Sequence, residues 1–109
     1  MKNFKVFKCF DLQGSIEIDR MVELEMNSGE EVLEFIYKDC LKDDEEWLEY
    51  MNNWIGEDWN IKEQVEGDLE GNIFNVMVAE EINYLVLRNY IGGVSEEKIE
   101  ELFYGLVGG

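Results

Sequence analysis

The segment from residue 15 to residue 26 alternates apolar and acidic side chains, and no other feature constrains the fold of this chain as strongly. In an extended chain one face would carry Ile16, Ile18, Val22, Leu24 and Met26, and the other would carry Glu17, Asp19, Glu23 and Glu25. A period of two residues is that of a β-strand with one buried face and one wet face. We therefore predict a strand whose apolar side chains all point inward and whose acids all point to water.

A second strand is expected just before it, over residues 4–11, and the turn signal Gln13-Gly14 joins the two strands as a hairpin. In this first strand, one face is expected to carry Phe4, Val6 and Phe10, and the other to carry Phe7 and Cys9.

Two helices are expected to follow the hairpin. Ser28-Gly29-Glu30-Glu31 has the pattern of a capping box and opens a helix that contains Cys40. Asp43 or Asp44 then starts a second helix that ends at Gly56. The apolar stripe of this second helix is Trp47, Leu48, Met51, Trp54 and Ile55.

The rest of the chain predicts three strands, over residues 58–66, 73–79 and 82–91, and a last helix from Ser95. The segment 82–91 also fits a helix, and we favour a strand because Val, Ile and Tyr dominate it. The order β-β-α-α-β-β-β-α predicts an α+β fold, a single domain over residues 1–109. We expect an antiparallel sheet of about five strands with three helices on one face.

The charge of the chain is extreme, with 26 Asp and Glu against 9 Lys and Arg and a net charge of -17. A small domain is usually soluble at a net charge of magnitude about 2 to 8, so solubility does not require this excess of acids. We therefore expect the excess to serve a function. Since 46% of the residues are apolar, the chain can build a core and is not a disordered acidic tail. The acids concentrate in residues 30–70, where three lysines accompany 15 of them.

Acids at helix starts complement the helix dipole, but many acids in this region lie elsewhere. We take them, with one tryptophan that they surround, as a candidate partner-binding surface: Glu45, Glu46, Glu49, Glu57, Asp58, Trp59, Glu63, Glu66, Asp68 and Glu70. The alternative interpretation is that the acids form a solvated face, in which case recognition would depend on apolar residues such as Trp59.

Most familiar site chemistry is absent from the sequence. The chain has no histidine, which removes Ser-His-Asp and Cys-His catalysis and two-histidine metal sites. It also lacks Cys-x-x-Cys and phosphate-binding glycine loops. Asp68-x-Glu70-x-Asn72 starts like a calcium loop but fails, because Ile73 and Ala79 occupy its glycine and glutamate positions. We expect no enzyme activity, no cofactor and no metal.

The two cysteines, Cys9 and Cys40, lie in apolar contexts and are expected to be buried thiols, with a disulfide as the alternative. No signal peptide and no run of 18 apolar residues is present, so we expect no membrane association and a cytoplasmic protein.

In its size, charge and placement of acids over residues 30–70, the chain resembles the small anti-restriction and anti-CRISPR inhibitors of phages and plasmids, several of which mimic DNA. The resemblance implies a non-enzymatic inhibitor, acting in the bacterial host cell, of a basic nucleic-acid-binding protein such as a defence nuclease. An acidic surface can occupy a basic channel in place of DNA, and the same charge should keep the chain from binding nucleic acid directly. The alternative is a small cytosolic adaptor domain for protein–protein interaction, whose acidity serves solubility and the choice of partner.

Overall fold

The computed structural model describes residues 2–43, 49, 64–78, 81–90 and 92–107. The elements in these ranges are, in chain order, β1 (Lys2–Asp11), β2 (Ile16–Met26), α1 (Gly29–Asp43), β3 (Val65–Gly67), β4 (Ile73–Met77), β5 (Ile82–Arg88) and α3 (Glu96–Leu106). The α+β class is therefore confirmed. The described ranges hold two helices instead of the expected three, so their order is β-β-α-β-β-β-α. The second expected helix, to Gly56, lies outside them except for Asp43, which ends α1, and Glu49.

The five strands form one antiparallel sheet in the order β2-β1-β5-β4-β3. The hairpin of β1 and β2 is confirmed, and Gln13 and Gly14 in its turn both have positive φ. The segment 82–91 does form a strand, over residues 82–88, and this strand lies at the centre of the sheet. Only the end of the strand expected over residues 58–66 is described, as part of β3.

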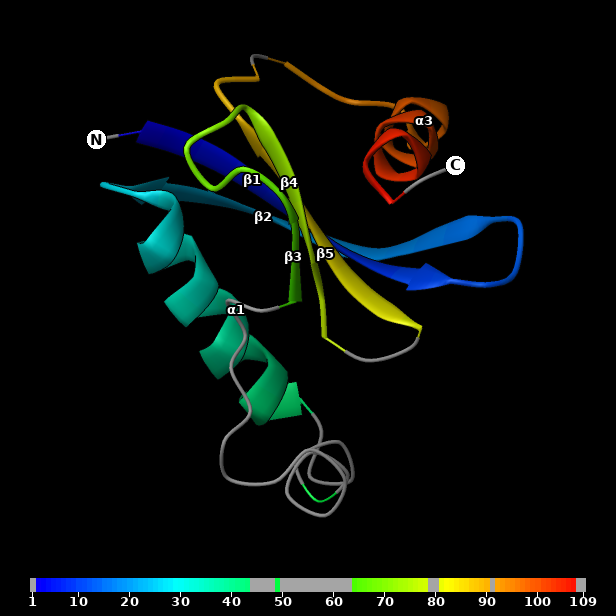
Figure 1. Cartoon of the computed structure of the whole chain (residues 1–109), viewed down its shortest axis with the longest axis horizontal. Coiled ribbons are helices and arrows are strands. Elements are labelled where there is room, and N and C mark those ends of the chain that lie inside the picture. The colour runs from blue at the N-terminus through cyan, green and yellow to red at the C-terminus, as the bar shows by residue number, and fades with distance from the viewer. Residues whose placement is uncertain (1, 44–48, 50–63, 79–80, 91, 108–109) are drawn as a thin grey trace.

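The two helices lie on opposite sides of the sheet, as Figure 1 shows, so the expectation that all helices cover one face is wrong. On the first side, Leu33 and Ile36 of α1 pack against the sheet, and on the second side Ile99 and Phe103 of α3 do so. The physical reason lies in β5, whose alternate side chains enter the two cores. Tyr84 and Val86 belong to the α1 core, and Leu85 and Leu87 belong to the α3 core. A strand that is apolar on both faces needs a cover on each.

A β-bulge in β2 divides its apolar face between the two cores. Lys8 pairs with Arg20 and Cys9 pairs with Ile18, so Asp19 is an extra residue without a partner on β1. Before the bulge, Ile16 and Ile18 pack into the α3 core; after it, Leu24 and Met26 pack into the α1 core. The prediction that all five apolar residues of β2 face one core is therefore wrong. The four acids are exposed as predicted, but Glu17 lies on the α1 side and Glu23 and Glu25 lie on the α3 side, so the prediction that they share one face is wrong.

Both described helices begin as the sequence predicts. The Ser28 hydroxyl accepts the N–H of Glu31 at 3.4 Å, and the Glu31 carboxylate accepts the N–H of Asn27 at 2.8 Å. The Ser95 hydroxyl accepts the N–H of Lys98 at 3.2 Å, which caps α3. These bonds satisfy N–H groups that a helix start leaves without intrahelical partners.

One polar cluster ties α1 to the sheet. The Asp39 carboxylate accepts a hydrogen bond from the Tyr84 hydroxyl at 2.8 Å and forms an ion pair with Arg20 at 2.5 Å. Tyr84 is almost fully buried, and burial raises the pKa of its hydroxyl far above the ordinary value. Asp39 therefore connects the edge strand, the central strand and the helix through one carboxylate.

Two single-residue deletions test the bulge. Deleting Asp19 removes only the extra residue, so Ile18 keeps facing α3 and Leu24 keeps facing α1. Deleting Glu23, an equally acidic and exposed residue of the same strand, turns the side chains on one side of the deletion to the wrong face. Losing the burial of two large apolar side chains should lower the free energy of unfolding by about 3 kcal/mol or more.

Urea denaturation of the two deletion variants measures this difference. We expect the Glu23 deletion to cost clearly more stability than the Asp19 deletion. Equal losses for the two variants would show that the register of β2 is not the one described.

Candidate functional site

Four of the ten candidate partner-binding residues lie in the described ranges, and all four are exposed: Glu49, Glu66, Asp68 and Glu70. Glu66 is on β3, and Asp68 and Glu70 are in the turn between β3 and β4. The other six candidates lie outside the described residues: Glu45, Glu46, Glu57, Asp58, Trp59 and Glu63.

The turn after β3 uses its acids to fix its own backbone. The Asp68 carboxylate accepts the N–H of Glu70 at 3.0 Å, and the Asp68 carbonyl accepts the N–H of Gly71 at 2.9 Å. The carboxylate of Glu70 lies 3.7 Å from the Lys2 ammonium. Within the described ranges no cluster of three or more metal-ligating side chains occurs, in this turn or elsewhere. The turn is thus a self-bonded acidic loop.

The fold brings this turn against the start of α1. A Cβ atom added to Gly29 would lie only 2.5 Å from the carbonyl oxygen of Leu69, so the two backbones touch. The first turn of α1 carries Glu30 and Glu31. Acids that are about forty positions apart in the sequence therefore belong to one region of the surface. The capping-box pattern explains Glu30 and Glu31 locally, and no sequence signal connects them to Asp68.

Among the described residues, most acidic side chains are exposed, whereas most basic side chains are half-buried. Fourteen acidic side chains with a described exposure are exposed: Glu17, Asp19, Glu23, Glu25, Glu30, Glu34, Glu49, Glu66, Asp68, Glu70, Glu81, Glu96, Glu97 and Glu101. The exposed bases in the described ranges are Lys38, Lys42 and Lys98, whereas Lys2, Lys5, Lys8, Arg20 and Arg88 are half-buried. The ratio of acidic to basic side chains is therefore higher among the described exposed residues than in the whole sequence.

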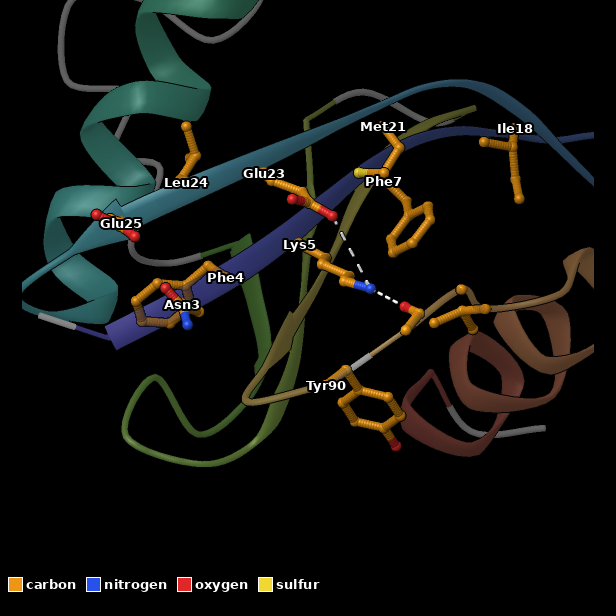
Figure 2. Close-up of a pocket in the computed structure, with 13 residues that line it drawn as sticks. Asn3, Phe4, Lys5, Phe7, Ile18, Met21, Glu23, Leu24, Glu25 and Tyr90 are labelled. Atoms are coloured by element: carbon orange, nitrogen blue, oxygen red, sulfur yellow. Dashed lines mark hydrogen bonds and ion pairs between the residues drawn. The ribbon is translucent and has the colours of Figure 1, made fainter.

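A groove of about 940 Å³ lies between the β1–β2 ladder and the residues Tyr90, Gly92, Gly93 and Val94, and we call it the β2 groove. It lies on the α3 side of the sheet, beyond the part that α3 covers (Figure 2). Its apolar lining includes Phe7, Met21 and Val94, and Glu23 and Glu25 belong to its β2 side. Met21 is directly opposite Phe7 in the ladder and is 44% exposed.

Lys5 holds the two sides of the β2 groove together. Its ammonium donates a hydrogen bond to the carbonyl of Gly92 and lies 4.0 Å from the Glu23 carboxylate, as Figure 2 shows. The Lys5 side chain is only 12% exposed, whereas that of Glu23 is 67% exposed. The Lys5 ammonium is therefore engaged by residues of the groove wall. The exposed charge of the groove is negative.

Cys9 and Cys40 are both buried and belong to different cores, Cys9 beside α3 and Cys40 beside Tyr84 on the α1 side. The sheet separates them, so no disulfide joins them and the prediction of two buried thiols is confirmed. Burial raises the pKa of the Cys9 thiol to about 12. This environment suits an inert core residue and not a nucleophile.

Comparison of the chain with protein-family models, with curated proteins and with solved structures finds no match. Neither described helix has the length and apolar character needed to span a membrane.

The thiol of Cys9 gives a direct test of this core. An unfolded thiol with its ordinary pKa of 9.0 is half ionised at pH 9.0, whereas the native Cys9 thiol stays protonated until about pH 12. The folded state thus loses stability as the pH rises from about 9 towards 12, because only the unfolded state releases the proton. Iodoacetamide at pH 9.0 should leave Cys9 unmodified in the native protein and modify it rapidly in urea, as peptide mass mapping would show. Rapid native labelling of Cys9 would contradict its burial.

Proposed function

We propose that this chain is a non-enzymatic binding protein that inhibits a basic, nucleic-acid-handling protein of a bacterial host cell. Its acidic surface occupies the site where that protein holds DNA or RNA. A defence nuclease, either a restriction enzyme or a CRISPR effector, is the partner class that fits this chemistry.

The segregation of charge carries this proposal. Solubility alone does not require the bases to be withdrawn from the surface, since a surface with both signs interspersed and a net charge of magnitude about 2 to 8 is already soluble. Here the half-buried bases are engaged in the fold: Lys5 bonds Gly92, Arg20 pairs with Asp39, and Arg88 donates to the Glu70 carbonyl at 2.9 Å. The exposed acids are thus left with few bases to offset them, and the field of the surface is negative.

The spacing of the acids indicates that a surface formed by several elements, and not the acids of one strand alone, would imitate the phosphates of DNA. Acids at alternate positions of β2 are about 6.6 Å apart along the strand. A DNA strand carries one phosphate per roughly 3.4 Å of helix axis, so one strand edge gives about half of that density. Acids from several elements are needed to match DNA, and the contact of the β3–β4 turn with the start of α1 brings two such groups together.

The adaptor alternative is favoured by the β2 groove, which offers an apolar surface that a pure charge mimic does not need. In an adaptor the groove residues, and not the acids of the turn, would determine affinity for the partner.

Competition for labelled duplex DNA separates the two functions. The assay measures fluorescence anisotropy of a short duplex bound to each of a panel of restriction enzymes and CRISPR effectors at low salt. We expect the chain to release DNA from at least one member, and to cause no anisotropy change with the duplex alone. Competition should weaken as salt is raised, because charge interactions are screened.

Two sets of substitutions with equal charge change provide the control. Glu49→Lys, Glu66→Lys and Glu70→Lys alter the candidate surface, and Glu17→Lys, Glu81→Lys and Glu101→Lys alter exposed acids elsewhere. The first set should weaken competition by about tenfold or more, since like charge facing a basic site costs several kcal/mol. The second set should have a smaller effect. Absence of competition against every panel member would overturn the proposed function.

A further inference from the structure

Among the described strands, β2 is at one edge of the sheet and pairs only with β1, so one row of its backbone groups is left open by the described sheet. Asn89 donates its N–H to the Asn3 carbonyl, and Asp11 donates its N–H to the Glu81 carbonyl, so the odd-numbered residues of β1 bond to β5. In an antiparallel ladder the direction of these groups alternates, so the even-numbered residues of β1 bond to β2. The partners of Phe4 and Val6 on β2 are Leu24 and Val22.

It follows that Met21, Glu23 and Glu25 direct their N–H and C=O groups away from β1, toward the open edge. Their side chains lie on the same face as Phe7, Lys5 and Asn3, the residues opposite them in the ladder. That face forms one side of the β2 groove, and all three residues line it. Open hydrogen-bonding groups and groove-facing side chains therefore come from the same three residues.

We propose that β2 binds an extended basic segment of a partner protein as a sixth, antiparallel strand of the sheet. In this register an apolar residue lies opposite Met21, and Lys or Arg lies opposite Glu23 and Glu25. The antiparallel direction gives the order basic-x-basic-x-apolar in the partner. Antiparallel pairing continues the arrangement of the whole sheet and is slightly more stable than parallel pairing.

Charge complementarity selects this occupant. The side chains of directly opposed residues are about 5 Å apart, close enough for ion pairs between the two strands. A second copy of this chain would instead bring the four exposed acids of one β2 against those of another, and opposed like charges are destabilising. Nucleic acid would meet the same repulsion.

The β2 groove also provides the apolar contact. The partner residue opposite Met21 would lie beside a side chain that is 44% exposed and next to Phe7. The bond from Lys5 to Gly92 fixes the facing wall before any partner arrives, which lowers the ordering cost of binding.

This inference is independent of the proposed function, because it concerns β2 and an extended peptide and not the turn after β3 and a DNA channel. Failure of the competition assay with nucleases would leave it standing.

Synthetic heptapeptides test the inference on the intact chain. The probe is Thr-Lys-Thr-Lys-Thr-Leu-Thr, and the controls are the same residues with the lysines adjacent and a version with Glu for both lysines. Binding is measured by amide chemical shifts in ¹⁵N-labelled protein at low salt. We expect the alternating basic peptide to bind about tenfold more tightly than either control and to shift the amides of Met21, Glu23 and Glu25.

Methylation of one peptide nitrogen distinguishes strand addition from loose charge attraction. In the proposed register each lysine directs its N–H toward β2, and the threonine between them directs its N–H away. N-methylation of the lysine opposite Glu23 should therefore abolish binding, and N-methylation of that threonine should be tolerated. Equal effects of the two modifications would overturn the proposal.

A charge swap completes the test. The variant Glu23→Lys with Glu25→Lys should lose the basic peptide and bind the Glu peptide instead. The variant Glu17→Lys with Glu81→Lys, which makes the same change of net charge outside the groove, should keep the preference for the basic peptide. If the two variants behave alike, only net charge matters and the proposed site is wrong.

Discussion

Burial of β5 on both faces is the constraint on which the rest of the structure depends. This strand lies at the centre of the sheet, and five consecutive residues, from Asn83 to Leu87, are buried. Its alternate side chains need two separate covers, which α1 and α3 provide. Between these layers the described buried residues include no charged side chain, because an unpaired buried charge is very costly. The acids must therefore lie at the rims and on the outer helix faces.

The described basic side chains are mostly half-buried, whereas the acidic ones are mostly exposed, and this difference makes the described surface negative. The long stems of Lys and Arg can be buried while their charged ends reach a partner. Lys5 ends at the Gly92 carbonyl, Arg20 at Asp39 and Arg88 at the Glu70 carbonyl, so each of these bases connects two segments of the chain. Positive charge thus connects segments within the fold, and negative charge is exposed to solvent.

Sequence periodicity predicted the elements that one local pattern determines. The hairpin, the two capped helices and the strand at 82–88 all follow from such patterns. The exposure of Glu49, Glu66, Asp68 and Glu70 followed in the same way. The bulge at Asp19 did not, although Arg20 and Met21 interrupt the alternation beside it, because the apolar residues on both sides of the interruption keep even-numbered positions and so predict a single face.

The features that sequence reasoning missed join distant segments. The placement of helices on both faces depends on β5, whose two apolar faces are also compatible with a helix. The contact of Gly29 with Leu69 and the β2 groove, which unites Lys5, Met21 and Val94, are products of tertiary packing. No single window of the sequence contains them.

Residue-resolved hydrogen exchange of the native protein tests the central claim, a sheet covered on both faces and open along β2, most directly. The amides of Leu85, Val86 and Leu87 should exchange slowest, because they lie in the central strand between the two cores. Along β2, the amides of Val22 and Leu24 should be protected by their bonds to β1, and those of Met21, Glu23 and Glu25 should exchange rapidly. Protection of Met21, Glu23 and Glu25 equal to that of Val22 and Leu24 would contradict the account, since it would mean that the edge of β2 is already paired.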